Sequence, residues 1–237
     1  MSRQKVWESI WSKKYESYHD HKDLHVAAGY DMLSYAQYQT LASYFIDKLS
    51  LQPEYNFLEV GCGCGAFLEQ VNKRVRSVSG IDYSSHAIAR LKGIMEGEFE
   101  ISQASEIPFE ANSFDCITSF SVFIYFESYD YATRVMDEML RALKPGGTIL
   151  IGDVSDIARI READNVRKTQ SSDRATRRVS EENADHLYYA SGFFLDYASQ
   201  HDLNCEIINQ SVSQLNFYPN ASYRFSVIMS PVDEGNV

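Results

Sequence analysis

The sequence predicts an α/β protein with a mostly parallel, doubly wound sheet and a helical extension on its N-terminal side. Short apolar segments alternate with helical patterns between residues 56 and 153, which is typical of parallel sheets. The first of these segments runs directly into a glycine-rich turn and then a helix. The 237 residues are enough for one well-packed α/β domain and few for two.

The elements follow from the spacing of apolar residues. Helical patterns cover residues 6–18, 31–49, 66–73, 129–143 and 190–200, and apolar strand patterns cover 56–60, 77–81, 98–101, 114–119, 148–153, 203–209 and 224–229. Ser84 or Ser85 can cap the helix after the second strand. Lys144-Pro145-Gly146-Gly147 predicts a sharp turn into the fifth strand. Residues 155–181 are polar and predict a long loop with at most one helical piece.

Composition narrows the class of protein. The formal net charge of −11 disfavours a nucleic-acid partner, because an acidic surface repels phosphate backbones. No apolar run approaches the roughly 18 residues needed to cross a bilayer, so no membrane partner is expected. No apolar segment follows the positive charges of the first residues, as a secretory signal would require. The four cysteines do not form a disulfide framework, which favours a cytoplasmic setting: Cys62, Cys64, Cys116 and Cys205.

The glycine-rich turn Gly61-Cys62-Gly63-Cys64-Gly65 is the most informative stretch. Glycines allow a sharp turn and a close approach of a ligand to the main chain, and the following helix N-terminus adds exposed N–H groups. Gly61, Gly63 and Ala66 satisfy the dinucleotide pattern G-x-G-x-x-G/A, and Asp82 lies where an acid would bind a ribose hydroxyl. Taken alone, this turn fits either a nicotinamide cofactor or another nucleoside cofactor.

Neighbouring motifs distinguish between these two kinds of cofactor. Leu58-Glu59-Val60-Gly61-Cys62-Gly63-Cys64-Gly65 resembles the first motif of class I methyltransferases, and Gly80-Ile81-Asp82-Tyr83-Ser84 resembles their acidic second motif. Ile107-Pro108-Phe109 with Ser113-Phe114-Asp115 resembles the third and fourth motifs. Leu143-Lys144-Pro145-Gly146-Gly147 resembles the turn before the fifth strand. The resemblance covers residues 56 to 153 and implies a Rossmann-like, seven-stranded sheet with an antiparallel last strand.

The resemblance also implies S-adenosylmethionine as cofactor. It assigns Asp82 to the ribose hydroxyls, Tyr83 to the adenine face and Glu59 to the loop or the cationic amino group. Gln103 stands where the family often has Asp and is expected to accept from the adenine amino group. An N-terminal helix over the cofactor would bring Tyr15 or Tyr30 to the methionine carboxylate. The full set of expected cofactor residues is Tyr15, Tyr30, Glu59, Gly61, Cys62, Gly63, Asp82, Tyr83, Gln103, Ala104 and Phe120.

The chain is expected to form a single domain over residues 1–237. Residues 1–55 would be a helical cap, 56–153 the cofactor-binding core, and 154–237 the substrate-side segment with the last strands. The first and last parts would roof the carboxyl edge of the sheet, which favours a small-molecule acceptor. The alternatives are a catalytically inactive cofactor-binding or interaction protein and an NAD-dependent oxidoreductase. Oligomeric state stays open.

No motif fixes a catalytic base. The candidates are His25, His186, Tyr125, Tyr188 and Tyr189, because such groups can take a proton from an acceptor. His19, His21 and His25 lie close together without matched partners, so no metal site is expected. A basic cluster in this acidic chain suggests an anionic acceptor, bound by forked guanidinium groups: Arg167, Lys168, Arg174, Arg177 and Arg178.

Overall fold

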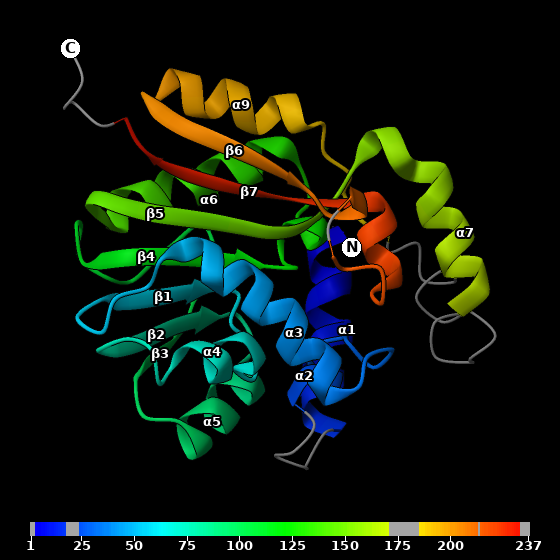
Figure 1. Ribbon diagram of the computed structural model, residues 1–237. Helices are drawn as coiled ribbons and strands as arrows, with labels where there is room; N and C mark the ends of the chain where they lie inside the picture. Colours follow the sequence, from blue (N-terminus) through cyan, green and yellow to red (C-terminus); the bar gives the residue numbers. More distant parts are fainter. Residues whose placement is uncertain (1–2, 18–23, 171–184, 213, 233–237) are drawn as a thin grey trace.

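The computed structural model describes residues 3–17, 24–170, 185–212 and 214–232. Its centre is a seven-stranded sheet with the strand order β3-β2-β1-β4-β5-β7-β6 (Figure 1). Neighbours from β3 to β5 are parallel, whereas β7 runs antiparallel to both β5 and β6. The predicted doubly wound sheet with an antiparallel last strand is therefore confirmed.

The strands lie close to their predicted positions. They are β1 Asn56–Val60, β2 Ser77–Asp82, β3 Glu98–Ile101, β4 Phe114–Phe120, β5 Leu143–Ser155, β6 Leu203–Asn209 and β7 Arg224–Pro231. The start of β5 was predicted wrongly, because the expected turn at residues 144–147 belongs to the strand. Leu143 already pairs with Phe114, and the register then shifts before Cys116 pairs with Thr148. This irregularity absorbs the residues that the sequence had assigned to a turn.

The helices differ from prediction mainly at their ends. They are α1 Arg3–Ser17, α2 Leu24–Ala27, α3 Tyr35–Ile46, α4 Ala66–Val71, α5 Ser85–Ile94, α6 Tyr129–Ala142, α7 Ile160–Gln170 and α9 Ser191–Gln200. The helix expected from residue 31 begins at Tyr35, because Ser34 forms a capping box with Gln37. Ser84 caps α5 by accepting from the Ala87 N–H. The long loop predicted over residues 155–181 contains α7, and residues 171–181 lie outside the described chain.

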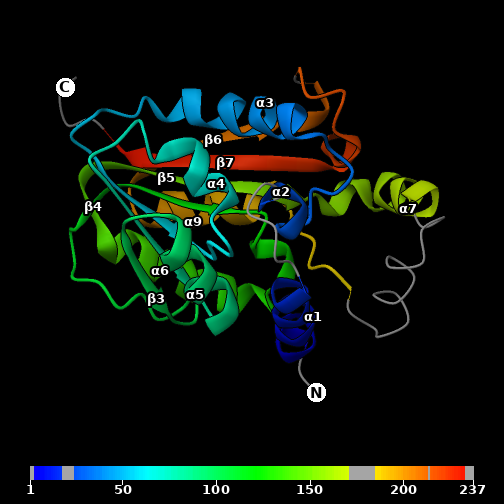
Figure 2. The ribbon, with the colours of Figure 1, turned by 90° about the horizontal axis from the view of Figure 1, so that it is seen from below.

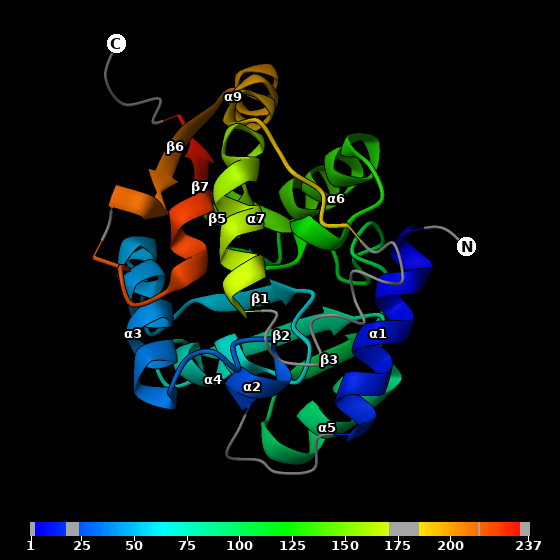
Figure 3. The same ribbon diagram turned by 90° about the vertical axis from the view of Figure 1, so that its right-hand side faces the viewer.

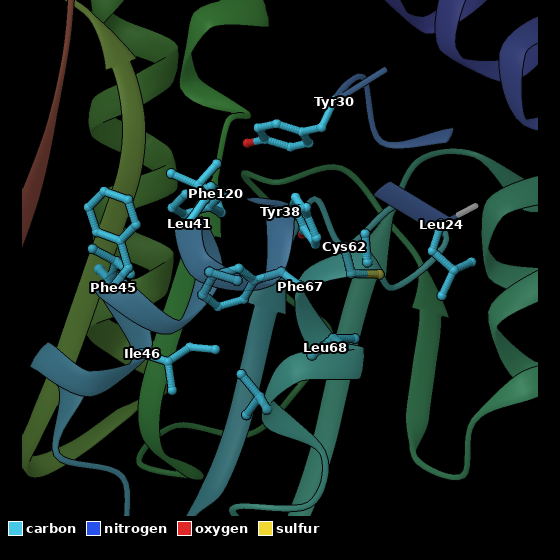
Figure 4. Packing of buried hydrophobic residues seen from close by; sticks show 14 of the residues in the cluster. Leu24, Tyr30, Tyr38, Leu41, Phe45, Ile46, Cys62, Phe67, Leu68 and Phe120 are labelled. Carbon is cyan, nitrogen blue, oxygen red and sulfur yellow. The ribbon is translucent and has the colours of Figure 1, made fainter. Parts of the chain in front are cut away.

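Helices cover both faces of the sheet and bury two apolar cores. The first core joins one face to α3, α4 and α5, and the second joins the other face to α6 and α9. Figure 2 shows α3 on one side of the sheet and α6 and α9 on the other. Phe67 and Phe120 stack in the first core with ring centroids 4.9 Å apart, and Tyr30 lies at its margin (Figure 4). These cores fix the strands whose ends carry the site.

The carboxyl ends of the parallel strands face α1, α2 and α7. Figure 3 looks onto this edge and shows the three helices in front of the strands. The edge is where ligands bind in doubly wound sheets. Within the described residues, none of the helices has the length and apolar character needed to cross a membrane.

Candidate active site

The turn after β1 is built on left-handed backbone. Gly61, Gly63 and Gly65 have φ of +78°, +50° and +86°. Residues other than glycine rarely adopt this left-handed region. A Cβ on Gly61 would lie 2.6 Å from Val122, and one on Gly63 would lie 2.4 Å from the Tyr15 hydroxyl. The glycines therefore serve two needs, since they permit the turn and leave room for side chains packed over it.

A cavity opens above this turn. The empty space within it, including the open solvent at its mouth, is about 880 Å³. All eleven residues expected at the cofactor line it: Tyr15, Tyr30, Glu59, Gly61, Cys62, Gly63, Asp82, Tyr83, Gln103, Ala104 and Phe120. They come from α1, from the turn before α3, from the ends of β1, β2 and β4, and from the segments that follow β1, β2 and β3. The fold thus gathers distant parts of the chain around one space.

Two buried carboxylates stand in the cavity wall. Asp82 accepts the Gly63 N–H at 2.9 Å on Oδ2 and the Ser84 N–H at 2.8 Å on Oδ1. Burial raises the pKa of Asp82 to about 6, although these two N–H groups favour the charged form. Burial and the nearby Asp82 charge raise the pKa of Glu59 well above its usual value. Glu59 Oε2 is buried and has no hydrogen-bond partner among the described residues.

Helix α1 closes one side of the cavity with Trp7, Glu8, Trp11 and Tyr15. Its position is fixed by the Gln103 Nε2 donor, 3.1 Å from Glu8 Oε1, and by the Tyr83 hydroxyl, 3.5 Å from the Trp7 carbonyl. The Trp7 ring also lies 4.6 Å from that of Tyr125. Trp7, Trp11 and Tyr15 recur at helical spacing within the predicted helix over residues 6–18, but such spacing does not distinguish a cavity wall from a core.

A buried polar cluster supports the cavity at the end of β5. Asp153 is completely buried and has φ of +62°. Its Oδ2 accepts from the hydroxyls of Tyr218 at 2.8 Å and Tyr30 at 3.2 Å, and it forms an ion pair with Arg224. Sequence reasoning missed this cluster because its members lie far apart along the chain. The cluster holds Tyr30, one of the cavity residues, by its hydroxyl.

The catalytic candidates fall in different places. Tyr125 lines the cavity. His25 is buried outside it, with Nε2 3.1 Å from the Leu33 carbonyl oxygen. Tyr189 lies in the second core and donates to the Phe123 carbonyl at 2.9 Å. Tyr188 is half-buried, and neither it nor His186 lines the cavity. Of the five candidates, the structure therefore brings Tyr125 to the cavity.

His186 lies one layer behind the cavity wall. Its ring stacks on Trp7 at 5.2 Å and meets Tyr125 edge-on at 5.3 Å. Arg167 Nη2 lies 2.8 Å from His186 Nδ1. Burial and the Arg167 charge hold the pKa of His186 well below its usual value, so the ring is neutral at neutral pH.

The predicted basic cluster is described only in part. Arg167 and Lys168 belong to α7, whereas Arg174, Arg177 and Arg178 lie outside the described residues, as do His19 and His21. Over the described chain, no three His, Cys, Asp or Glu side chains are grouped to hold a metal ion. Arg167 lies against His186 and above the Tyr188 ring, with 5.6 Å from its guanidinium carbon to the ring centroid.

Comparison with known proteins shows which domain the central part of the chain resembles. The family model described as "Methyltransferase domain" matches residues 58–151. Part of the chain is 32% identical over 121 residues to chondramide synthase cmdD of Chondromyces crocatus, covering 48% of this chain and 3% of that protein. It is also 32% identical over 128 residues to "Probable tRNA methyltransferase 9B" of Homo sapiens, covering 48% of this chain and 27% of that protein. The chain thus spans under a third of the length of either relative.

The fold has a close counterpart among solved structures. Phosphoethanolamine N-methyltransferase 1 of Haemonchus contortus, in complex with phosphoethanolamine and S-adenosylhomocysteine, superposes with a TM-score of 0.68 at 13% identity. The match covers 99% of this chain and 50% of that one. The sheet order and this superposition show a Rossmann-like fold. Residues 58–151 match a methyltransferase domain, and the superposition shows that the chain shares the fold of that solved methyltransferase.

Proposed function

We propose that this protein transfers a methyl group from S-adenosylmethionine to a small-molecule acceptor. The observation that carries the proposal is the convergence of eleven residues, expected from the family resemblance, on one cavity at the carboxyl edge of the sheet. We also propose the three parts that the sequence predicts: residues 1–55 form the cap, residues 56–153 the cofactor-binding core, and residues 154–237 the substrate-side segment.

The polar groups of the cavity suit this cofactor. Glu59 Oε2, buried and without a partner in the described chain, can accept from the cationic amino group of the methionine part. Each Asp82 oxygen accepts one backbone N–H and keeps a lone pair for a ribose hydroxyl. The rings of Trp7, Trp11 and Tyr15 stand in the wall, and aromatic faces attract a cation such as a sulfonium.

When bound, S-adenosylmethionine supplies an electrophilic methyl group. The chain must then hold the acceptor in line with that group and exclude water. We assign the Tyr125 hydroxyl to this task, since it is the one catalytic candidate in the cavity. Tyr30, which the resemblance assigned to the methionine carboxylate, donates its hydroxyl hydrogen to Asp153 instead, so we reassign it to the acceptor. Its oxygen lone pairs can therefore accept a hydrogen bond from the acceptor.

The charge of the acceptor is a separate part of the proposal. We retain a small anionic acceptor, with Arg167 as the described member of the basic cluster nearest the cavity wall, through His186. The acidic net charge favours small molecules over nucleic acids. Because one relative is named a tRNA methyltransferase, tRNA belongs in the set of acceptors to be tested.

Two measurements test the proposal. Calorimetric titration should show that S-adenosylhomocysteine binds and that NAD does not, and the reverse result would make the protein a nicotinamide-binding one. Turnover should then be measured with labelled S-adenosylmethionine against phosphorylated and carboxylated metabolites, neutral metabolites and tRNA. Methylation of a small molecule supports the proposal. Binding without turnover on any acceptor favours an inactive cofactor-binding protein.

A further inference from the structure

The amide of Gln103 is held between two side chains at the end of the cavity beside β3. Its Oε1 lies 3.5 Å from the Tyr131 hydroxyl, and its Nε2 donates to Glu8 Oε1 at 3.1 Å. Gln103, Tyr131 and Glu8 all line the cavity. The family resemblance had suggested that Gln103 would accept from the adenine amino group. In the structure its oxygen faces Tyr131, and its nitrogen brings a carboxylate to the same place.

We propose that Glu8 is the residue that recognises the 6-amino group of the cofactor's adenine. This inference rests on the proposed function, because it deepens the same cofactor site. Glu8 comes from α1, 95 residues before Gln103 in the chain. The cap thus supplies the carboxylate that the loop after β3 lacks, and Gln103 positions it.

The other carboxylates of the wall do not serve this purpose. Glu59 ends close to the glycine turn, and Asp82 is bound to Gly63 and Ser84 at the end of β2. Glu8 instead lies beside Gln103, at the side where Tyr83 is expected to meet the adenine face. The Tyr83 hydroxyl lies 3.5 Å from the carbonyl oxygen of Trp7, the residue before Glu8, so Tyr83 packs against the same turn of α1.

The chemistry discriminates between bases. An amino group donates hydrogen bonds, and a carboxylate only accepts them, so adenine is favoured. Hypoxanthine carries a carbonyl oxygen at the same position. This oxygen and the carboxylate both accept hydrogen bonds, so they cannot form one with each other. A Glu8→Gln side chain can donate to that oxygen. The residue at position 8 therefore sets the preference for adenine over hypoxanthine.

The test measures binding of S-adenosylhomocysteine and of its hypoxanthine counterpart, S-inosylhomocysteine, by calorimetry. The natural protein should prefer the adenine ligand strongly, and Glu8→Gln should reduce the ratio of the two dissociation constants by about tenfold or more. Glu16→Gln, an exposed position on the same helix, is the matched control and should keep the ratio of the natural protein.

The outcomes separate this inference from the proposed function. If S-adenosylhomocysteine does not bind the natural protein, the proposed function fails and the inference fails with it. If it binds and Glu8→Gln leaves the ratio unchanged, the inference alone is overturned. An equal loss of affinity for both ligands also overturns it, because Glu8 would then merely dock α1 on the cavity.

Discussion

The two ends of the cavity are built in different ways. At the cofactor end, the turn after β1 and the end of β2 contribute main-chain geometry: positive φ at three glycines, and two backbone N–H groups bound to Asp82. At the end that we assign to the acceptor, Tyr30 and Tyr125 are positioned by side chains from elements distant in the chain, such as Asp153 on β5 and Trp7 on α1. The first end is encoded locally, and the second depends on the whole fold.

The largest expected effect lies at the locally encoded end. Gly63→Val should abolish binding of S-adenosylhomocysteine, because the new side chain meets the Tyr15 hydroxyl and the backbone has φ of +50°. Calorimetry measures the loss, and circular dichroism checks the fold. Gly93→Val is the matched control, since a Cβ there has no neighbour within 4 Å. Normal binding by folded Gly63→Val would place the cofactor elsewhere.

Asp82→Ala should weaken S-adenosylhomocysteine binding by more than tenfold and leave the protein folded. Two hydrogen bonds to a charged group are lost, each contributing about 1.5–3 kcal/mol. Asp82→Asn keeps the shape and tests the charge alone. Unchanged affinity in both variants would show that this carboxylate does not bind the ribose.

Removing the hydroxyl of Tyr125 or of Tyr189 compares a cavity residue with a core residue. Tyr125→Phe should lower kcat about tenfold with unchanged affinity for S-adenosylhomocysteine, if its hydroxyl positions the acceptor. Tyr189→Phe removes the hydrogen bond to Phe123 and should instead reduce the free energy of unfolding by about 1 kcal/mol. Steady-state kinetics and urea unfolding measure the pair. If the two variants have the same kcat, the Tyr125 hydroxyl does not position the acceptor.

The raised pKa of Asp82, about 6, predicts a pH dependence of cofactor binding. The ribose hydroxyls donate to the charged form, so affinity is nearly complete at pH 7, about half of that at pH 6, and lower still as the carboxylate gains a proton below pH 6. Between pH 7 and pH 5 the affinity for S-adenosylhomocysteine should fall several-fold, by at most about tenfold per pH unit. Titrations at four pH values measure this decline, and Asp82→Asn should flatten it.

The smallest effect concerns the basic cluster. Arg167→Gln, and Gln in place of Arg174, Arg177 and Arg178, should raise KM for an anionic acceptor about threefold and leave cofactor affinity unchanged. The competing explanation is pairing with nearby acidic residues, which contributes about 0–1 kcal/mol at a surface. If all of these variants have the same KM as the natural protein, the proposal of an anionic acceptor is wrong.

The difference between the two ends also explains what the sequence could predict. β1, β3 and β6 match their expected bounds, and the glycine turn and Asp82 are found where expected, because each depends on residues adjacent in sequence. Tyr15, on α1, lines the cavity as the family resemblance implied. The end of α6 and the start of β5 were misplaced by the turn pattern at 144–147, which tertiary pairing with β4 overrode.

The missed residues share one physical property: each acquires its role from a partner far along the chain. Asp153 and Arg224 are 71 residues apart, and Glu8 and Gln103 are 95 apart. A lone Asp after a strand or a lone Glu on a helix looks like ordinary surface in the sequence. One signal was present in the sequence: Asp153 is a charged residue near the carboxyl end of β5, the edge of the sheet where ligands bind.

Helix α1 has a spectroscopic consequence. The chain contains two tryptophans, Trp7 and Trp11, and both line the cavity from this helix. Each indole N–H is buried without a partner among the described residues. All of the protein's indole fluorescence therefore originates beside the cavity. Occupancy by a ligand can be followed directly from the intrinsic emission of the unlabelled protein, in equilibrium titrations and in stopped-flow traces.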